Sequence, residues 1–372
     1  MGLELVGTSA MRTMQDLPSM PRQAFRGWSI NEGEFPQAGS AVERLRFLLG
    51  YGVLAPSVYN SQPWRFAVGA DSIEVCADRM RALPAADPHG RALIQSCGAV
   101  IENLSGAGRY FGYRVEVEPF PDPVRPELVA RLRFAAGNPP DAAERAQFRS
   151  LTQTWTGDLP FDPDPPSPAL QSGLQQAARE RGCTLAFIKR ATARLLLREL
   201  VIDAERAQHR LPAVVAERRR WIRQPGENAL DGISPEAAGD APVPARELGI
   251  PPWSMDIGRS GVDAHLDQLA ARVDAAPLLA VLATRHDAPR DWLAAGRGWQ
   301  HLALEARGAG LWLSPLNAPV RVPAVRRRLR GLLPTRGWAQ AVVALGFGSE
   351  IQAPRRRAPQ AWALSDAPAL PH

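Results

Sequence analysis

The sequence predicts an α+β protein made of two copies of one structural unit. Stretches of alternating apolar residues, typical of strands, are interleaved with stretches of helical spacing along the 372-residue chain. Residues 98–115 also align without a gap with residues 296–313, and in both segments we expect a helix, a glycine that ends it, and a strand. The chain is therefore expected to imitate a homodimer, with antiparallel-rich sheets flanked by helices and two pseudo-symmetric units about a two-fold axis.

The repeat rests on four matched pairs of residues and on a shared order of elements. The pairs are Gly98 with Gly296, Leu104 with Leu302, Gly112 with Gly310, and Val115 with Leu313. In both halves a strand also precedes the helix. The order of elements adds support that four matches alone would not give.

In the first half, a helix is expected over 41–54, where Leu45, Leu48 and Leu49 fall on one face. The elements expected after it are a hairpin over 64–78, a long helix over 87–112 that starts at an Asp-Pro cap, strands over 113–120 and 127–133, and a helix over 141–152. Trp64 begins the hairpin, and we expect its side chain to lie in the core.

The second half opens with the Pro-rich stretch 159–168. The elements expected after it are helices over 167–182, 191–209 and 289–309, and strands over 183–189, 277–284 and 339–348. Residues 223–260 are rich in Pro and Gly and lack periodicity, which is typical of a lid or of disorder.

These elements define the expected domain limits. Residues 1–40 form an N-terminal extension, 41–152 the first unit, 153–360 the second unit with the lid segment 223–260, and 361–372 a tail.

Composition argues against a nucleic-acid binder. The net charge is +6, but Lys189 is the only lysine among 44 basic residues, a bias that suggests a GC-rich genome. Most arginines are interspersed with acids. The run from Arg326 to Arg330 is interpreted as a solvated helix face. No stacking or base-recognition motif accompanies it.

The cysteines and the hydropathy pattern indicate the compartment. Cys76, Cys97 and Cys183 lie in apolar stretches and match no zinc or redox spacing, so we expect buried free thiols. Residues 1–25 do not resemble a signal peptide, and no run of about 18 apolar residues is present. The expectation is a soluble cytoplasmic protein, a monomeric pseudo-dimer or a homodimer, with a small-molecule substrate and no nucleic-acid or membrane partner.

The loop "APSVYNSQPWRF" (55–66) is the strongest functional signal. It is dense in hydrogen-bonding groups, yet it leads directly into an apolar strand, which suggests a loop that holds a ligand. The side-chain amides of Asn60 and Gln62 each carry a donor and an acceptor, and Ser57 adds a hydroxyl. The alternative is that these side chains close the loop by bonding to its backbone.

This loop resembles that of the FMN-dependent nitroreductases. The stretch "DPHGRALIQSCGAVIENL" (87–104) resembles their Acg-like branch, in which two nitroreductase units are fused in one chain. The central "DGI" (231–233), the second-half stretch 291–317 and the tail "GFGSEIQAPRRRAP" (346–359) are similar to that branch too. The resemblance spans about residues 41–360 and implies a nitroreductase-like fold with a flavin cleft between the units.

The resemblance also implies roles for individual residues. Asn60 and Gln62 would read the pyrimidine edge of the flavin, and Ser57 would bond ring or phosphate oxygens. Guanidinium groups bind phosphate through paired bonds, which suits Arg355, Arg356 and Arg357; the alternative is a solvated basic tail. The stretch that lies along one flavin face in the family would here contribute Ser314, Leu316 and Asn317, unless it is a plain connector.

The opening of the second unit departs from the family pattern. The branch carries Arg-His-Thr-Asn-Arg before a Pro-Phe pair, where this chain reads "TWTGDLPF". Thr154 and Asp158 therefore stand where arginines are expected, and only Thr156 is retained. The loss of two positive charges beside a phosphate predicts weakened FMN binding, unless other arginines such as Arg149 compensate.

Two readings of the function follow. In the first, an enzyme binds FMN, takes electrons from NAD(P)H and reduces a small nitroaromatic or quinone-like acceptor in a ping-pong reaction. In the second, the chain is a non-redox or degenerate protein that binds or sequesters flavin, or holds another ligand in the former flavin cleft. The histidines show no metal-ligand spacing and no set of nucleophile, base and acid is present, so neither a metal site nor a catalytic side chain is predicted.

Overall fold

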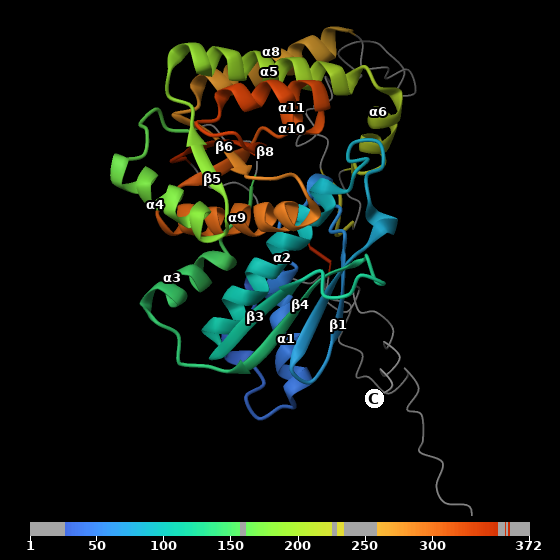
Figure 1. Ribbon diagram of the computed structural model, residues 1–372, viewed down its shortest axis with the longest axis vertical. Helices are drawn as coiled ribbons and strands as arrows, with labels where there is room; N and C mark the ends of the chain where they lie inside the picture. Colours follow the sequence, from blue (N-terminus) through green and yellow to red (C-terminus); the bar gives the residue numbers. More distant parts are fainter. Residues whose placement is uncertain are drawn as a thin grey trace, which may run out of the picture.

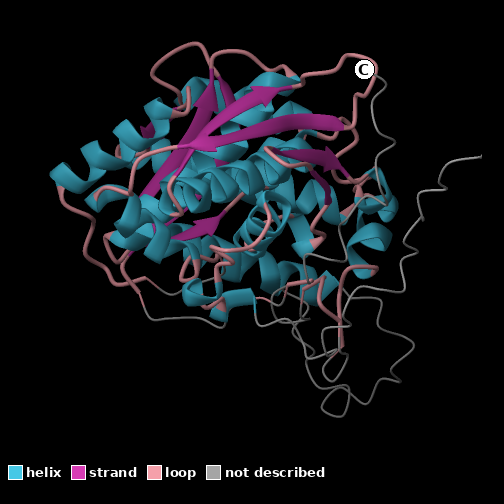
Figure 2. Cartoon of the chain, turned by 90° about the horizontal axis from the view of Figure 1, so that it is seen from below, coloured by secondary structure: helices cyan, strands magenta, loops and turns pink. Residues whose placement is uncertain are grey.

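The computed structural model describes residues 27–156, 161–224, 229–233, 259–348, 354 and 356–357. The chain forms two four-stranded antiparallel sheets with helices packed against them. Two long helices, α2 (Arg91–Tyr110) and α9 (Pro289–Gly308), lie against each other between the sheets (Figure 1). Figure 2 shows the strands lying across a layer of helices. The predicted α+β class is confirmed.

The first sheet has the strand order β1-β2-β4-β3. Its strands are β1 (Trp64–Val68), β2 (Ser72–Ala77), β3 (Tyr113–Pro119) and β4 (Leu128–Ala136). One face packs on α1 (Ala41–Gly52) and α2, with the fully buried Trp64 in the core. The opposite face carries a ladder of charged side chains in which Glu74 pairs with Arg125 and Arg131. Helix α3 (Ala142–Leu151) then leads to the second unit.

The second sheet has the equivalent order, β5-β6-β8-β7. Its strands are β5 (Thr184–Phe187), β6 (Leu278–Thr284), β7 (Trp312–Pro315) and β8 (Trp338–Gly346). One face packs on α4 (Pro168–Glu180) and α9. The other is covered by α5 (Ala191–His209), α8 (Arg259–Ala275), α10 (Ala318–Arg321) and α11 (Pro323–Leu329). Strand β6 is therefore buried along its whole length, which explains its unbroken apolar sequence.

The internal repeat predicted from the sequence is confirmed. Helices α2 and α9 have the same length of 20 residues. Each is followed by a glycine with a left-handed backbone, Gly112 at φ 81° and Gly310 at φ 79°. Each sheet also carries a bulge in its second strand, at Val75/Cys76 in β2 and at Leu282/Ala283 in β6. One chain thus forms an intramolecular pseudo-dimer.

The two helices touch most closely at a pair of glycines that the alignment matched. A Cβ on Gly98 would lie 2.4 Å from the Leu293 carbonyl oxygen, and one on Gly296 would lie 2.0 Å from the Gln95 carbonyl oxygen. Both distances are far shorter than a van der Waals contact. The atoms that would be met belong to the backbone, which cannot move aside as a flexible side chain can. The crossing therefore requires glycine on both helices.

We expect Gly296→Ala to lower the free energy of unfolding by about 3 kcal/mol, because the added methyl group overpacks the crossing. The control is Gly173→Ala in α4, where no atom lies within 4 Å of the added Cβ. This control is expected to stabilise the chain by about 0.5–1 kcal/mol, because alanine is the better helix former. Urea unfolding curves measure both. Equal stabilities for the two variants would show that the helices can separate at little cost.

Two sequence-based expectations need correction. Helix α2 begins at Arg91 rather than at residue 87, because Gly90 has a left-handed backbone (φ 70°) that no helix can contain. The arginine run is only partly solvated. Arg326 is buried, its guanidinium is bonded to both carboxylate oxygens of Asp287 at 2.6 and 2.7 Å, and its Nε donates to the Ala339 carbonyl at 2.8 Å. Helix α11 packs on the second sheet and so draws this side chain inward, while Arg328 remains at the surface.

The cysteine prediction is confirmed, because all three thiols are buried and free. Burial raises the pKa of Cys76 to about 11 and that of Cys183 to about 12. Among the described residues, no helix is long and apolar enough to span a membrane. Helix α6 (Pro212–Arg219) and α8 were not predicted. Of the predicted lid segment 223–260, the structure describes only residues 223–224, 229–233 and 259–260. The domain limits given above stay predictions.

Candidate functional site

The loop between α1 and β1 has an unusual backbone. Tyr59, Asn60 and Gln62 have φ values of 52°, 49° and 51°, and they are three of the four non-glycine residues with positive φ in the described part of the chain. Each such residue costs about 1 kcal/mol or more. The Ser57 hydroxyl accepts a hydrogen bond from the Gln62 backbone N–H at 2.9 Å and so holds the turn. Strain of this kind clusters at functional sites, which makes the loop a candidate for one.

The two amides of the loop are buried and bonded to distant parts of the chain. Gln62 has no exposed surface, and its Nε2 donates to the carbonyls of Leu230 at 2.8 Å and Asn60 at 3.3 Å. Its Oε1 accepts from the Arg357 N–H at 3.1 Å. Asn60 Oδ1 accepts from Arg356 Nη1 at 3.0 Å. Gln62 therefore organises the loop, as in the loop-closing interpretation, while both amides also contact the C-terminal tail.

The tail brings a buried guanidinium to the loop. Arg356 is 3% exposed, and its Nη2 donates to the Leu54 carbonyl at 3.1 Å. Its guanidinium lies 5.1 Å from the ring centre of Trp28, whose Nε1 donates to the Pro354 carbonyl at 2.6 Å. Burial lowers the pKa of Arg356 to about 9. Arg356 and Arg357 thus meet the loop, whereas Arg355 lies outside the described residues.

A row of tryptophans connects this cluster to the opening of the second unit. Trp155 lies 5.1 Å from Trp28 and 5.6 Å from Trp312, measured between ring centres. Thr154 and Thr156 flank Trp155 and line a cavity of about 10 Å³. Thr154 is buried, and its Oγ1 donates to the Ser150 carbonyl at 2.6 Å.

Two arginines bring positive charge to the tryptophan row, near Thr154, which stands where the family pattern has an arginine. Arg307 lies 4.3 Å from the ring centre of Trp312 and donates to the Gln153 carbonyl at 3.1 Å. Arg356 lies on the other side of the tryptophan row, over Trp28. Arg149, in contrast, is exposed on α3. Asp158 lies outside the described residues. Arg307 and Arg356 are therefore better placed than Arg149 to replace the positive charge that the arginines of the family pattern would supply.

The end of β7 and the stretch that follows it are bonded to their own sheet and to α8. The Ser314 hydroxyl accepts from Arg272 Nη2 at 3.2 Å, and the Leu316 N–H donates to the Val342 carbonyl at 2.8 Å. Asn317 Oδ1 accepts from the Val342 N–H at 2.9 Å. These are the contacts of a connector. The stretch nevertheless leads into α10, where Arg321 lies 5.7 Å from the ring centre of Tyr59 in the loop.

Residues 229–233 also contact the loop. The Gly232 N–H donates to the Asn60 carbonyl at 3.3 Å, and Asp231 pairs with Arg81 and with Arg223, the latter at 2.9 Å. Beside them lies a cavity of about 10 Å³ that Arg81 and Ser61 help to line. Each of these two cavities has room for only about one water molecule.

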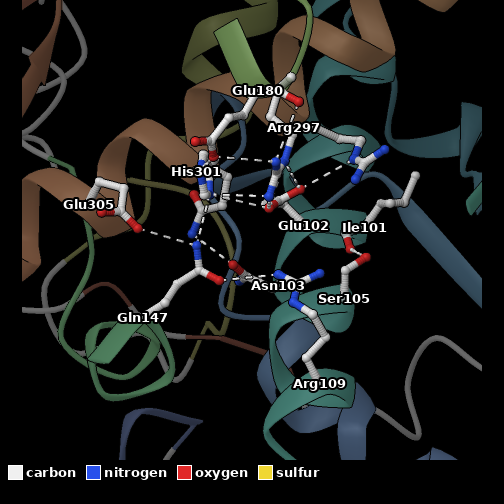
Figure 3. Close-up of polar contacts among 12 residues, drawn as sticks. Ile101, Glu102, Asn103, Ser105, Arg109, Gln147, Glu180, Arg297, His301 and Glu305 are labelled. Carbon is white, nitrogen blue, oxygen red and sulfur yellow. Dashed lines mark hydrogen bonds and ion pairs between the residues drawn. The ribbon is translucent and has the colours of Figure 1, made fainter. Parts of the chain in front are cut away.

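A buried ionic cluster that the sequence did not predict lies between α2 and α9 (Figure 3). Glu102 is fully buried, and its carboxylate lies 2.6 Å from Arg181 Nη2, 3.3 Å from Arg297 Nε and 3.4 Å from His301 Nδ1. Burial alone would raise the pKa of Glu102, but hydrogen bonds from His301 and Arg181 and the charge of Arg297 hold it well below its ordinary value.

The residues next to this cluster form a neutral pair across the same helices. Gln300 Nε2 donates to Asn103 Oδ1 at 2.8 Å. The only signal in the sequence was a charged residue within the apolar stretch "GAVIENL". The bonds of Glu102 go to Arg181, Arg297 and His301, none of which belongs to the loop or the tail. We therefore assign the cluster to the pairing of the two units through α2 and α9.

Known proteins resemble this chain in sequence over most of its length. An uncharacterised protein of Mycobacterium tuberculosis is 27% identical over 324 residues, which cover 82% of this chain and 88% of the relative. A putative NAD(P)H nitroreductase of that organism is 27% identical over 327 residues, 87% of this chain and 89% of the relative. Another, the putative NAD(P)H nitroreductase acg, is 31% identical over 121 residues, 32% of this chain and 37% of the relative. No family model matches the chain.

Among solved structures, the FMN-dependent nitroreductase NfnB from Mycobacterium smegmatis in complex with NADPH covers 61% of this chain and 100% of its own, with 18% identity and a TM-score of 0.39. The relatives in sequence, rather than this partial superposition, indicate the kinship of the chain.

Proposed function

We propose that this chain, which belongs to the Acg-like nitroreductases, is an FMN-dependent oxidoreductase that takes electrons from NAD(P)H and passes them to a small oxidised acceptor. One observation carries the proposal. The strained loop of Ser57 to Gln62 is held against the buried Arg356, 296 residues further along the chain than Asn60. A backbone strained in this way, with amide groups and a guanidinium turned toward one another, suits a polar ligand that bears an anionic group.

The donor set fits FMN. A side-chain amide such as that of Asn60 matches the donors and acceptors along the pyrimidine edge of a flavin. Arg356 donates to the oxygens of Asn60 and Leu54, and a phosphate dianion suits a buried guanidinium because its opposite charge offsets the burial of the cation. Arg357 and the Ser57 hydroxyl are in position to add further bonds. When bound, the flavin supplies the redox chemistry, while the protein supplies binding, orientation and electrostatics.

The remaining predicted residues are proposed to act around this centre. Gln62 positions the loop through Leu230 and Arg357. Thr156 is proposed to line the phosphate end next to Trp155, with Arg307 supplying charge. Ser314, Leu316 and Asn317 are proposed to border one face of the ring system. Arg355 is proposed to join the phosphate contacts.

A second function is favoured by a different observation. Gln62 and Asn60 already bond to residues 229–233 and to the tail, and the cavity beside the loop is small. A chain that closes over its ligand in this way would bind or sequester flavin without turnover. The two functions differ in whether an electron donor reaches the site.

We expect the purified protein to show the visible absorbance of oxidised flavin, or to acquire it when FMN is added. Anaerobic addition of NADPH or NADH then separates the two functions, because bleaching reports reduction by the nicotinamide whereas an unchanged spectrum indicates sequestration. Dithionite is the control that shows the bound flavin can be reduced. A colourless protein that ignores added FMN would refute both functions and direct the search to another ligand.

A further inference from the structure

We propose that Glu205, His209 and His265 form a binding site for a divalent transition-metal ion of the Zn²⁺ class, separate from the loop and the tail. The site goes beyond the proposed redox function. Glu205 and His209 lie four residues apart on α5 and so share one face of that helix. His265 comes from α8, which packs beside α5 (Figure 1).

The spacing of the three ligand atoms suits a single ion. Glu205 Oε1 lies 3.4 Å from His209 Nε2 and 3.6 Å from His265 Nε2, and all three atoms lie within 4.8 Å of one another. Zinc bonds of 2.0–2.1 Å in a tetrahedron place neighbouring ligand atoms about 3.3 Å apart. Two of the three separations are therefore close to the edge of a coordination tetrahedron. A small rotation of one imidazole would bring the third to that length.

The same separations are poor for hydrogen bonds. A strong bond between these groups would measure about 2.7–3.0 Å. The side chains of Glu205, His209 and His265 are only 17%, 12% and 17% exposed, so water does little to solvate them. Three mostly buried ligands that converge at distances longer than those of strong hydrogen bonds are better satisfied by an ion between them than by their mutual contacts.

Arg218 supplies a positive charge beside the cluster. This residue of α6 places Nη1 3.5 Å from Glu205 Oε1 and 3.4 Å from His209 Nε2. Its guanidinium therefore competes for the groups that would hold the ion. Metal binding therefore requires the Arg218 side chain to move away from Glu205 and His209. We expect Arg218 to lower the affinity for the ion and not to act as a ligand.

The chemistry of the donors sets the class of ion and its role. Two imidazoles and one carboxylate favour Zn²⁺, Co²⁺ or Ni²⁺ over Mg²⁺ or Ca²⁺, which prefer oxygen. An ion held by both helices would fasten α8 to α5 on the outer face of the second sheet. We infer that the ion has a structural role and holds the two helices together, with water completing its coordination.

Titration of the chelator-treated full-length protein with ZnCl₂ in a calorimeter tests the proposal. We expect one ion per chain and a rise in the melting temperature. His265→Ala is expected to weaken binding by about a hundredfold and to remove the thermal shift, and Arg218→Gln is expected to tighten binding by about tenfold. The matched control is His286→Ala, which removes an exposed histidine outside the cluster. Co²⁺ gives a second readout, because the intensity of its visible absorption reports the number and geometry of its ligands.

Each outcome decides the matter. Unchanged Zn²⁺ affinity in His265→Ala would place the ion elsewhere and overturn the proposal. Failure of the wild-type protein to bind Zn²⁺ would overturn it too, even if Arg218→Gln binds, because the arginine would then be the permanent cation of the cluster. Melting temperatures of the metal-free variants show whether each one has folded. MgCl₂ in the same titration shows whether the site selects for nitrogen-binding ions.

Discussion

Arg356→Ala is expected to weaken FMN binding by about a hundredfold or more. The guanidinium is buried beside Asn60, and in the proposed complex it makes two charge-assisted hydrogen bonds to phosphate. Such bonds contribute at least about 1.5 kcal/mol each, and every 1.4 kcal/mol is a factor of ten in affinity. Flavin fluorescence on titration of the cofactor-free protein measures the dissociation constant directly.

Two further variants make this result specific. Arg356→Lys keeps the charge but loses the planar fork, so its affinity should fall between those of the wild type and the alanine variant. Arg327→Ala removes an exposed arginine of α11 and should leave the affinity unchanged. If Arg356→Ala instead binds FMN more tightly, the tail occupies the place of the cofactor and does not hold it. The melting temperature of each cofactor-free variant separates loss of binding from loss of folding.

Glu102→Gln is expected to lower the free energy of unfolding by about 3–5 kcal/mol at neutral pH. The change leaves Arg181 and Arg297, which are only 16% and 26% exposed, without their buried carboxylate. The control is Glu116→Gln, which removes an exposed pair with Arg114 and should change stability by less than about 1 kcal/mol. Urea unfolding at pH 7 measures both variants.

The same cluster predicts a dependence on pH. Because the folded protein lowers the pKa of Glu102, the unfolded chain binds this proton more readily. The stability that the carboxylate contributes is therefore fully present above its ordinary pKa of about 4.3, and it is lost as pH falls below that value. The difference between wild type and Glu102→Gln should shrink in acid. A difference that stays constant down to pH 3 would show that the charge of Glu102 is not what stabilises the fold.

Much of the fold follows from local patterns in the sequence. The repeat was visible because Gly98 and Gly296 are demanded by the same helix crossing, and Gly112 and Gly310 by the same left-handed turn. Apolar alternation identified the strands of the first sheet, which has one charged face. The resemblance of the loop and tail to one family indicated that they serve one site, and two of the relatives in sequence are named putative NAD(P)H nitroreductases.

The features that the sequence did not reveal depend on distant partners. Arg326 is buried because its guanidinium donates hydrogen bonds to Asp287 and to the Ala339 carbonyl, and neither partner is a neighbour of Arg326 in the sequence. The pairing of His265 with His209 likewise requires two helices to pack side by side. The hydrogen bond from the Gln62 amide to the Leu230 carbonyl could not be predicted from the sequence, because it depends on how residues 229–233 pack against the loop.

The crossing of α2 and α9 has a consequence for how this chain can change over time. In the register that joins Gly98 to Gly296, Glu102 corresponds to Gln300 and Asn103 to His301. The contact of Glu102 with His301 and that of Asn103 with Gln300 are therefore mirror versions of one contact, the first charged and the second neutral. A homodimer has to accept every substitution twice, and a glutamate there would appear on both helices. Fusion into one chain frees each half to vary alone, so that a single acid meets a single histidine.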